Sequence, residues 1–123
     1  MVTKTHDIVA AATQTTDANP RTIITYTLPD NTVAQFFLQV VADLSSGTDC
    51  AGYIRRFVYK RQAAGAATIV GTVDSTVFPD KEDDSRWDVT ITTSTNDVLI
   101  QVVTTVAITV NWFAYLEVVL YTP

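Results

Sequence analysis

The residues with the most chemical potential in this sequence are its carboxylates, five of which fall between residues 74 and 84. Such oxygen ligands could hold a hard cation such as calcium, but the run lacks the glycine and ligand spacing of an EF-hand loop, and Lys81 and Arg86 interrupt it. Glycoside hydrolysis needs two carboxylates that flank one bond. The spacing of the carboxylates in this sequence does not indicate that any two of them would do so. We therefore expect a loop that its like charges keep solvated, with no metal site and no catalytic pair.

The other candidates for catalysis or metal binding are the single cysteine and the single histidine, Cys50 and His6. A structural zinc site takes four ligands, so this pair cannot complete one. A lone cysteine also excludes an intramolecular disulfide, and the Gly-x-Ser-x-Gly elbow of a serine nucleophile is missing. The sequence therefore predicts no catalytic residue, no cofactor and no enzyme activity, with Cys50 as an inert, partly buried thiol.

Half of the positive charge lies on one segment, where Arg55, Arg56, Lys60 and Arg61 alternate with aromatic residues. Basic and aromatic side chains on a strand can bind single-stranded nucleic acid. However, Arg55 and Arg56 would point to opposite faces of a strand, and a net charge of -5 opposes capture of a polyanion. We expect no nucleic-acid partner. Two alternatives stay open: a sheet edge guarded by charge, and arginines that pair with the acidic run across a subunit contact.

Composition indicates which elements must position these residues. A chain of 123 residues suits one compact domain. Its 21 threonines, 17 valines and 8 isoleucines favour strands over helices. The most apolar region, Val106 to Tyr121, is interrupted by Asn111 and Glu117, so we expect no membrane span. An all-β protein is predicted.

Alternation of apolar and polar residues marks about seven strands joined by short turns. In the clearest strand, over residues 33–43, one face carries Ala34, Phe36, Leu38, Val40 and Ala42. Segments 87–92 and 98–103, joined by a turn at 94–97, form the best-marked hairpin. Trp87 and Trp112 keep in phase with this pattern and are predicted to be core anchors. The pattern predicts an antiparallel β-sandwich, with the jelly roll as one variant.

The first 21 residues are polar, rich in alanine and threonine, and without a steady period. Pro20 biases Asn19 away from helix. We interpret residues 1–21 as an N-terminal arm that is disordered in the free protein or lies on a neighbouring subunit. Residues 22–123 are then a single β-sandwich domain.

The last segment, residues 106–121, is apolar on both faces. One face can fill the core, but the other also needs cover, because a solvated antiparallel sheet shows polar residues outward. A second sheet layer or a neighbouring subunit could provide that cover. We expect an oligomer interface here, formed by Phe113, Tyr115, Val119 and Tyr121 together with Arg56.

From Tyr53 onward the sequence resembles small β-modules of tailed-bacteriophage virion proteins. The resemblance rests on the basic-aromatic strand 53–61, the segment 66–73, the acidic run before Trp87, and Val110-Asn111-Trp112 in the last strand. Similar modules occur at the ends of tail and head fibres and as free-standing virion surface proteins. The resemblance brings no catalytic residue to this chain.

The resemblance implies a non-enzymatic virion structural protein, either a capsid decoration (cement) or a knob protein that docks as an oligomer on the capsid or tail. Its partners would be the major capsid protein or other virion proteins. Since a fibre tip follows a long shaft and Met1 begins only an arm, we expect a free-standing protein. A homotrimer suits the three-fold positions of a capsid and the axis of a fibre.

Two other functions stay open at the level of the sequence. One is a tail-fibre module that binds a host-surface receptor or carbohydrate, with Tyr53 or Tyr59 as stacking surfaces. The other is a small hydrolase that acts on cell-wall polysaccharide.

Overall fold

The computed structural model describes residues 3–74 and 78–122. These residues form strands and no helix, which confirms the all-β prediction. The strands are β1 (Thr3–Thr15), β2 (Arg21–Thr27), β3 (Thr32–Leu44), β4 (Cys50–Arg61), β5 (Thr68–Asp74), β6 (Lys81–Glu82), β7 (Trp87–Ser94), β8 (Asp97–Thr104) and β9 (Val110–Thr122). No helix of the described residues is long and apolar enough to cross a membrane.

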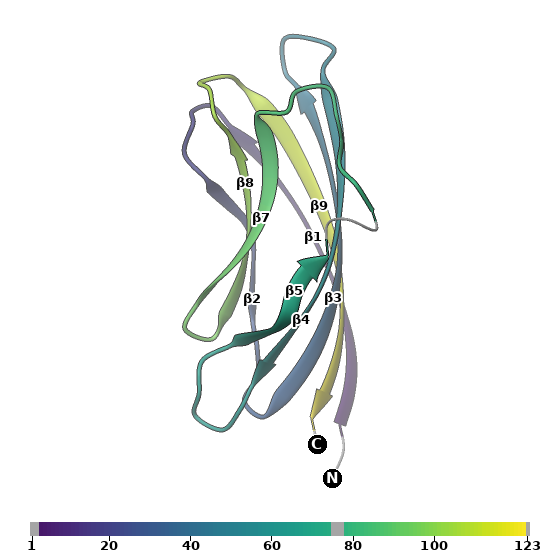
Figure 1. Ribbon diagram of the computed structural model, residues 1–123, viewed down its shortest axis with the longest axis vertical. Helices are drawn as coiled ribbons and strands as arrows, with labels where there is room; N and C mark the ends of the chain where they lie inside the picture. Colours follow the sequence, from purple (N-terminus) through teal and green to yellow (C-terminus); the bar gives the residue numbers. More distant parts are fainter. Residues whose placement is uncertain (1–2, 75–77, 123) are drawn as a thin grey trace.

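The described strands make two antiparallel sheets. Sheet A has the order β1-β9-β3-β4-β5, with β6 beside β4, and sheet B has the order β2-β8-β7. Figure 1 shows the two sheets packed face to face, with both chain ends at the same end of the molecule. This confirms the antiparallel β-sandwich. A jelly roll has eight strands in two sheets, so an unequal division into six and three described strands does not confirm that variant.

The core lies between the sheets and follows the alternation of the sequence. The five residues expected on the dry face of residues 33–43 are all buried. In β9 the buried residues are Trp112, Ala114, Leu116, Val118 and Leu120. Trp87 of sheet B meets Trp112 of sheet A, with ring centroids 6.1 Å apart, which confirms both as core anchors. Strand β9 begins at Val110, so residues 106–109 of the expected segment lie outside the observed strand.

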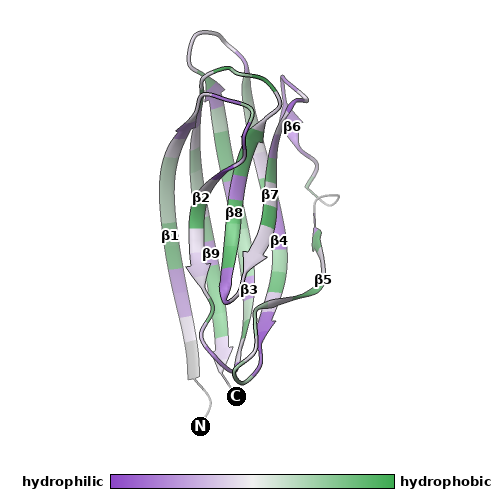
Figure 2. Cartoon of the chain, turned by 90° about the vertical axis from the view of Figure 1, so that its left-hand side faces the viewer, coloured by the Kyte–Doolittle hydropathy of each residue, from purple (hydrophilic) through white to green (hydrophobic). Residues whose placement is uncertain are grey.

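Strand β1 stands where the sequence predicted an N-terminal arm. It pairs with β9 along its full length, from Thr3 opposite Thr122 to Thr15 opposite Val110. In Figure 2, β1 lies at one lateral edge of the molecule and β5 at the other. Residues 3–15 therefore belong to the same sandwich as the rest of the described chain. Small alanine and threonine side chains give little hydrophobic contrast, so periodicity does not reveal this strand.

Two side-chain hydrogen bonds hold β1 against the core. The indole Nε1 of Trp112 donates to Thr15 Oγ1 at 2.9 Å, and both residues are buried. The hydroxyl of Tyr26, on β2, donates to Asp7 Oδ2 at 2.5 Å. Desolvation and this hydrogen bond raise the pKa of Tyr26. The second contact links sheet A to sheet B at the β1 edge.

Candidate functional site

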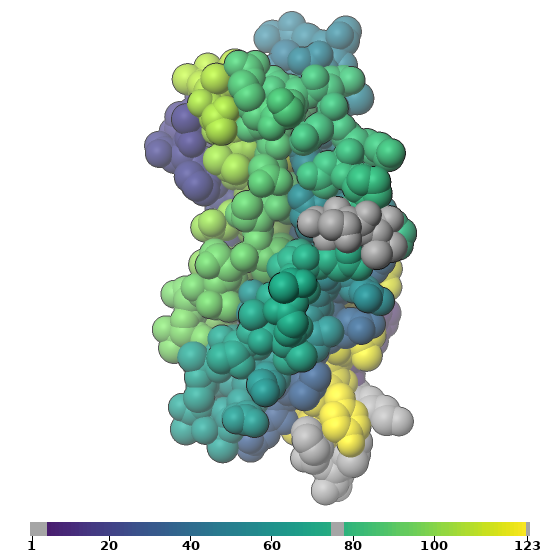
Figure 3. Space-filling model, in the orientation of Figure 1, coloured from purple at the N-terminus to yellow at the C-terminus, as the bar shows by residue number. Residues whose placement is uncertain are grey.

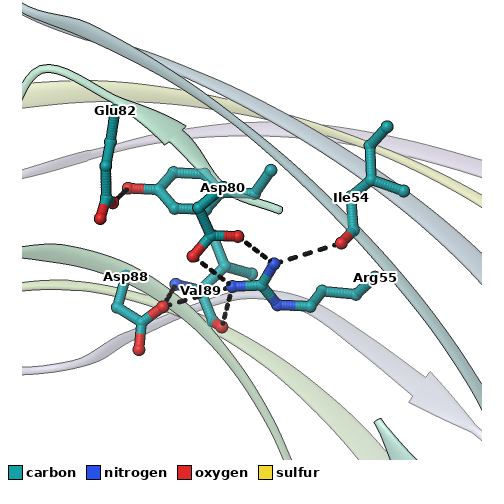
Figure 4. A network of polar contacts seen from close by, with 7 residues as sticks. Ile54, Arg55, Asp80, Glu82, Asp88 and Val89 are labelled. Carbon is teal, nitrogen blue, oxygen red and sulfur yellow. Dashed lines mark hydrogen bonds and ion pairs between the residues drawn. The ribbon is translucent and has the colours of Figure 1, made fainter. Parts of the chain in front are cut away.

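A buried arginine organises the polar chemistry between the two sheets. Arg55, on β4, is 4% exposed. Its Nη1 donates to Asp80 Oδ1 at 2.5 Å, and its Nη2 donates to Asp88 Oδ1 at 3.3 Å and to the carbonyl of Val89 at 3.4 Å (Figure 4). Arg55 therefore pairs with the acidic run within one chain, and not across a subunit contact.

Tyr53 extends this cluster, which we call the Arg55 cluster and which consists of Tyr53, Arg55, Asp80, Glu82 and Asp88. The guanidinium of Arg55 lies 5.5 Å from the centre of the Tyr53 ring. The Tyr53 hydroxyl donates to Glu82 Oε2 at 2.7 Å, and Glu82 sits on β6 opposite Ala51 of β4. Burial is the main cause that raises the pKa of Tyr53, and this hydrogen bond raises it further. The phenol therefore acts as a fixed hydrogen-bond donor.

The acidic run is not a loop of unpaired charges, because most of these carboxylates have partners. Besides Asp80 and Glu82, Asp83 Oδ2 accepts from the backbone N–H of Cys50 at 3.0 Å. The Arg86 guanidinium donates to Asp84 at 2.7 Å and lowers the pKa of that carboxyl to about 2. Arg86 is a neighbour of Asp84 in the sequence, whereas the partners of Asp80, Glu82 and Asp83 lie 25 to 33 residues away and are brought to them by the fold.

Cys50 is exposed, in contrast to the partly buried thiol expected from the sequence. Its Sγ lies 3.6 Å from Asp83 Oδ2. The hydrogen bond to Asp83 and the negative charge of that carboxylate raise the pKa of the thiol. Among the described residues, no three His, Cys, Asp or Glu side chains gather as a metal site would require.

We expect Cys50 to react slowly with iodoacetamide at neutral pH despite its exposure, because the thiolate is the nucleophile and a raised pKa keeps it protonated. In Asp83→Asn, the midpoint of the pH–rate profile should fall and the rate at pH 8 should increase several-fold. Asp97→Asn, at a distant carboxylate that accepts from Thr27, is the control. Identical profiles for the wild type and Asp83→Asn would contradict this account.

The structure brings together a pair of carboxylates that the sequence did not pair. Asp80 and Asp88 are bound by one guanidinium and line a cleft of about 470 Å³ between β5 and β7. Figure 3 shows this side of the molecule, where the teal surface of β5 adjoins the green surface of β7. The available signal was Arg55 itself, since an arginine on the dry face of an alternating strand requires a buried carboxylate. Asp88 is half exposed and can accept hydrogen bonds from a ligand in the cleft.

The second candidate surface is the outer face of sheet A, the side turned away from sheet B. All five residues of the predicted interface belong to it. Phe113, Val119 and Tyr121 are 48%, 56% and 43% exposed. Tyr115 is half-buried and Arg56 is exposed. Because sheet B packs on the opposite face, no second sheet of the described chain covers these residues.

Neighbouring strands enlarge this apolar surface. The register places Val41 of β3 beside Phe113, and Val33 of β3 beside Tyr121. Ile8 of β1 is also exposed.

By contrast, Tyr53 and Tyr59 are 2% and 3% exposed, so neither can serve as the stacking surface expected for a carbohydrate. The opposite orientation of Arg55 and Arg56 is confirmed.

The fold and its surfaces define an antiparallel β-sandwich with one open, partly apolar face. No family model and no curated protein match the sequence. Among solved structures, the chain is similar to the tailspike protein of Acinetobacter baumannii phage AM24, with a TM-score of 0.50 and 12% identity over 98% of this chain. It also aligns with tailspike protein gp49 of Acinetobacter baumannii bacteriophage Fri1, a capsular polysaccharide depolymerase, with a TM-score of 0.46 and 10% identity over 98% of this chain.

The alignments cover 26% of the AM24 tailspike and 18% of the Fri1 tailspike, so this chain spans only part of the length of each. The similarity to the AM24 tailspike is one of fold, and it agrees with the β-module expected from the sequence. The expectation that the protein is not an enzyme is contradicted, because the Fri1 tailspike is a depolymerase. That expectation assumed that no two carboxylates meet, whereas Asp80 and Asp88 share Arg55.

Proposed function

We propose that the chain is a β-sandwich module of a tail-associated bacteriophage virion protein, and that the outer face of sheet A attaches it to a neighbouring protein surface. The observation that carries this proposal is the exposed apolar surface formed by Phe113, Val119 and Tyr121. The likeness in fold to part of the AM24 tailspike supports the phage setting, as does the sequence resemblance.

The physical argument for attachment is the cost of leaving this face in water. Full burial of one large apolar side chain is worth about 1.5–3 kcal/mol. Phe113, Val119 and Tyr121 each retain about half of their exposure, so covering them gains roughly 1 kcal/mol per residue. Exposed apolar side chains grouped on one face of a sheet are typical of an interaction surface.

The location can be tested in virions of a phage that encodes the chain. Heads and tails are separated by centrifugation, and the protein is quantified in each fraction by mass spectrometry. We expect it in the tail fraction at a fixed copy number. Recovery with the heads alone would favour capsid decoration, with the major capsid protein as partner, over the tail proposal. Absence from both fractions would refute a virion role.

A second candidate function is binding of a host-surface saccharide in the cleft beside the Arg55 cluster. The specific observation is the pair of carboxylates, Asp80 and Asp88, fixed on one guanidinium at the cleft wall. Carboxylates in fixed positions accept hydrogen bonds from sugar hydroxyls. To test this, the purified protein is incubated with capsular polysaccharides. Binding to the polysaccharide and the release of reducing ends are both measured. Asp88→Asn should reduce both, and an unchanged response would remove the cleft from consideration.

A further inference from the structure

The outer face of sheet A is divided by β3 into two unlike halves. Strand β3 lies between β9 and β4, so each outward residue of β3 has one register partner on either side. Three of these rows are Glu117–Phe37–Arg56, Val119–Gln35–Val58 and Phe113–Val41–Gly52. In each row the β9 residue and the β4 residue stand at about the same distance from β3.

The two halves complement each other row by row. The central row has an acid on β9 and a base on β4, with Phe37 between them, and the ring of Phe78 packs edge-on against Phe37 with centroids 6.1 Å apart. The next row has a valine on each side. In the third row, Phe113 projects from β9, whereas Gly52 on β4 has no side chain.

The β4 half contains a hollow at the height of Phe113. This hollow has a volume of about 360 Å³, and its lining includes Gly52, Ile54 and Phe78. A Cβ atom built on Gly52 would meet nothing within 4 Å. The phenyl ring of Phe113 is 48% exposed. One half of the face therefore presents an aromatic ring, and the other half presents a space that can take one.

We propose that the outer face of sheet A binds the same face of a second copy of this chain, related by a two-fold axis that runs along β3. This deepens the proposed function, on which it rests, by naming the occupant of that face. Rotation by half a turn about such an axis places β4 of each copy over β9 of the other. Glu117 then meets Arg56 of the second copy, Val119 meets Val58, and Phe113 enters the hollow at Gly52. Every contact occurs twice, as in an isologous interface.

The charged side chains are available for these contacts. His6 Nε2 lies 3.9 Å from Glu117 Oε2, and Arg56 Nη2 lies 3.9 Å from Asp74 Oδ2. Both are partly exposed ion pairs, which contribute little to stability, so Glu117 and Arg56 can exchange them for partners on a second copy. Glu117 and Arg56 retain 43% and 57% of their side-chain exposure.

The size of the face suits a stable dimer. The axis along β3 also places β1 of each copy over β5 of the other. Strands β1, β3 and β9 have 13 residues each, β4 has 12 and β5 has 7. At about 3.4 Å per residue and 4.8 Å between strands, these five strands cover on the order of 900 Å². A standard protein–protein interface buries about 800 Å² on each partner. The axis along β3 also keeps the facing strands nearly aligned, as in β-sandwich packing.

Charge reversal and mixing test the pairing. We expect a wild-type dimer in sedimentation velocity at micromolar concentration. Glu117→Arg and Arg56→Glu should each be monomeric when alone, with dissociation raised at least tenfold, because each places like charges together twice. An equimolar mixture should recover the dimer, since both pairs are then of opposite charge, and native mass spectrometry should find one copy of each variant. Thr92→Glu, on the outer side of sheet B, is the control and should stay dimeric.

Several results would overturn the proposal: a wild-type monomer or trimer, single variants that remain dimeric, or a mixture that stays monomeric. Circular dichroism checks that each variant keeps the β spectrum. If a charge reversal impairs folding, Gly52→Trp fills the hollow instead and must also give a monomer. Recovery of the protein in phage tails without a two-fold dimer would refute this pairing but not the proposed function. A dimer of a protein missing from virions would refute the proposed function alone.

Discussion

Arg55→Ala is expected to lower the free energy of unfolding by about 3–5 kcal/mol, the usual cost of removing one partner of a buried ion pair. The guanidinium is 5% exposed, and it binds Asp80, Asp88 and the carbonyl of Val89. Its loss leaves the Asp80 carboxylate, which is 26% exposed, without its cation. Urea unfolding followed by tryptophan fluorescence measures the change, since Trp87 and Trp112 lie in the core.

Arg21→Ala is the matched control for this experiment. It removes the same type of side chain from an exposed position on β2, where the guanidinium donates to the carbonyl of Gln14, so we expect a change within about 0.5 kcal/mol. Asp80→Asn combined with Arg55→Met should recover part of the loss, because no uncompensated carboxylate is then left at that position. Equal effects of Arg55→Ala and Arg21→Ala would contradict the buried cluster.

Deletion of residues 1–16 is expected to abolish cooperative unfolding and to produce an aggregating protein. The deletion removes every backbone partner of β9 on one side and exposes a long apolar strand as a sheet edge. It also takes away the Thr15 acceptor of the buried Trp112 indole, a loss of about 1–3 kcal/mol by itself. A thermal melt and size-exclusion chromatography report the outcome.

Deletion of residues 1–4 is the control for this truncation. It leaves Asp7 and Thr15, the two residues whose side chains bind Tyr26 and Trp112, in place. We expect a folded protein with a nearly unchanged melting temperature. A cooperative melt after the longer deletion would restore the interpretation of residues 1–21 as an arm.

Strong alternation made most of the fold predictable. In β3 and β9, apolar residues recur at every second position, and a shift of the register by one residue would expose all of them at once. Strand β1 escaped detection because alanine and threonine barely distinguish a buried position from an exposed one. Its position depends on the free edge of β9, a partner nearly one hundred residues away in the chain.

The two candidate sites also differ in how far the sequence predicts them. The five residues predicted to form an interface do share one face. Four of them could be chosen from the sequence because a strand with two apolar faces, β9, must cover both, whereas Arg56 lies on β4. The Arg55 cluster could not be assembled, because Asp80, Asp88 and Arg55 come from separate segments whose spacing carries no period.

The sequence by itself determined the class of fold, the dry face of β3 and the apolar excess on β9, since these depend on residue types at a spacing of two. Only the tertiary structure decided that β1 completes sheet A, that the acidic run docks on Arg55, and that Tyr53 and Tyr59 are core residues. The physical reason is that periodicity reports which side of a strand is dry. It does not report which distant backbone edge, cation or carboxylate will be brought to that side.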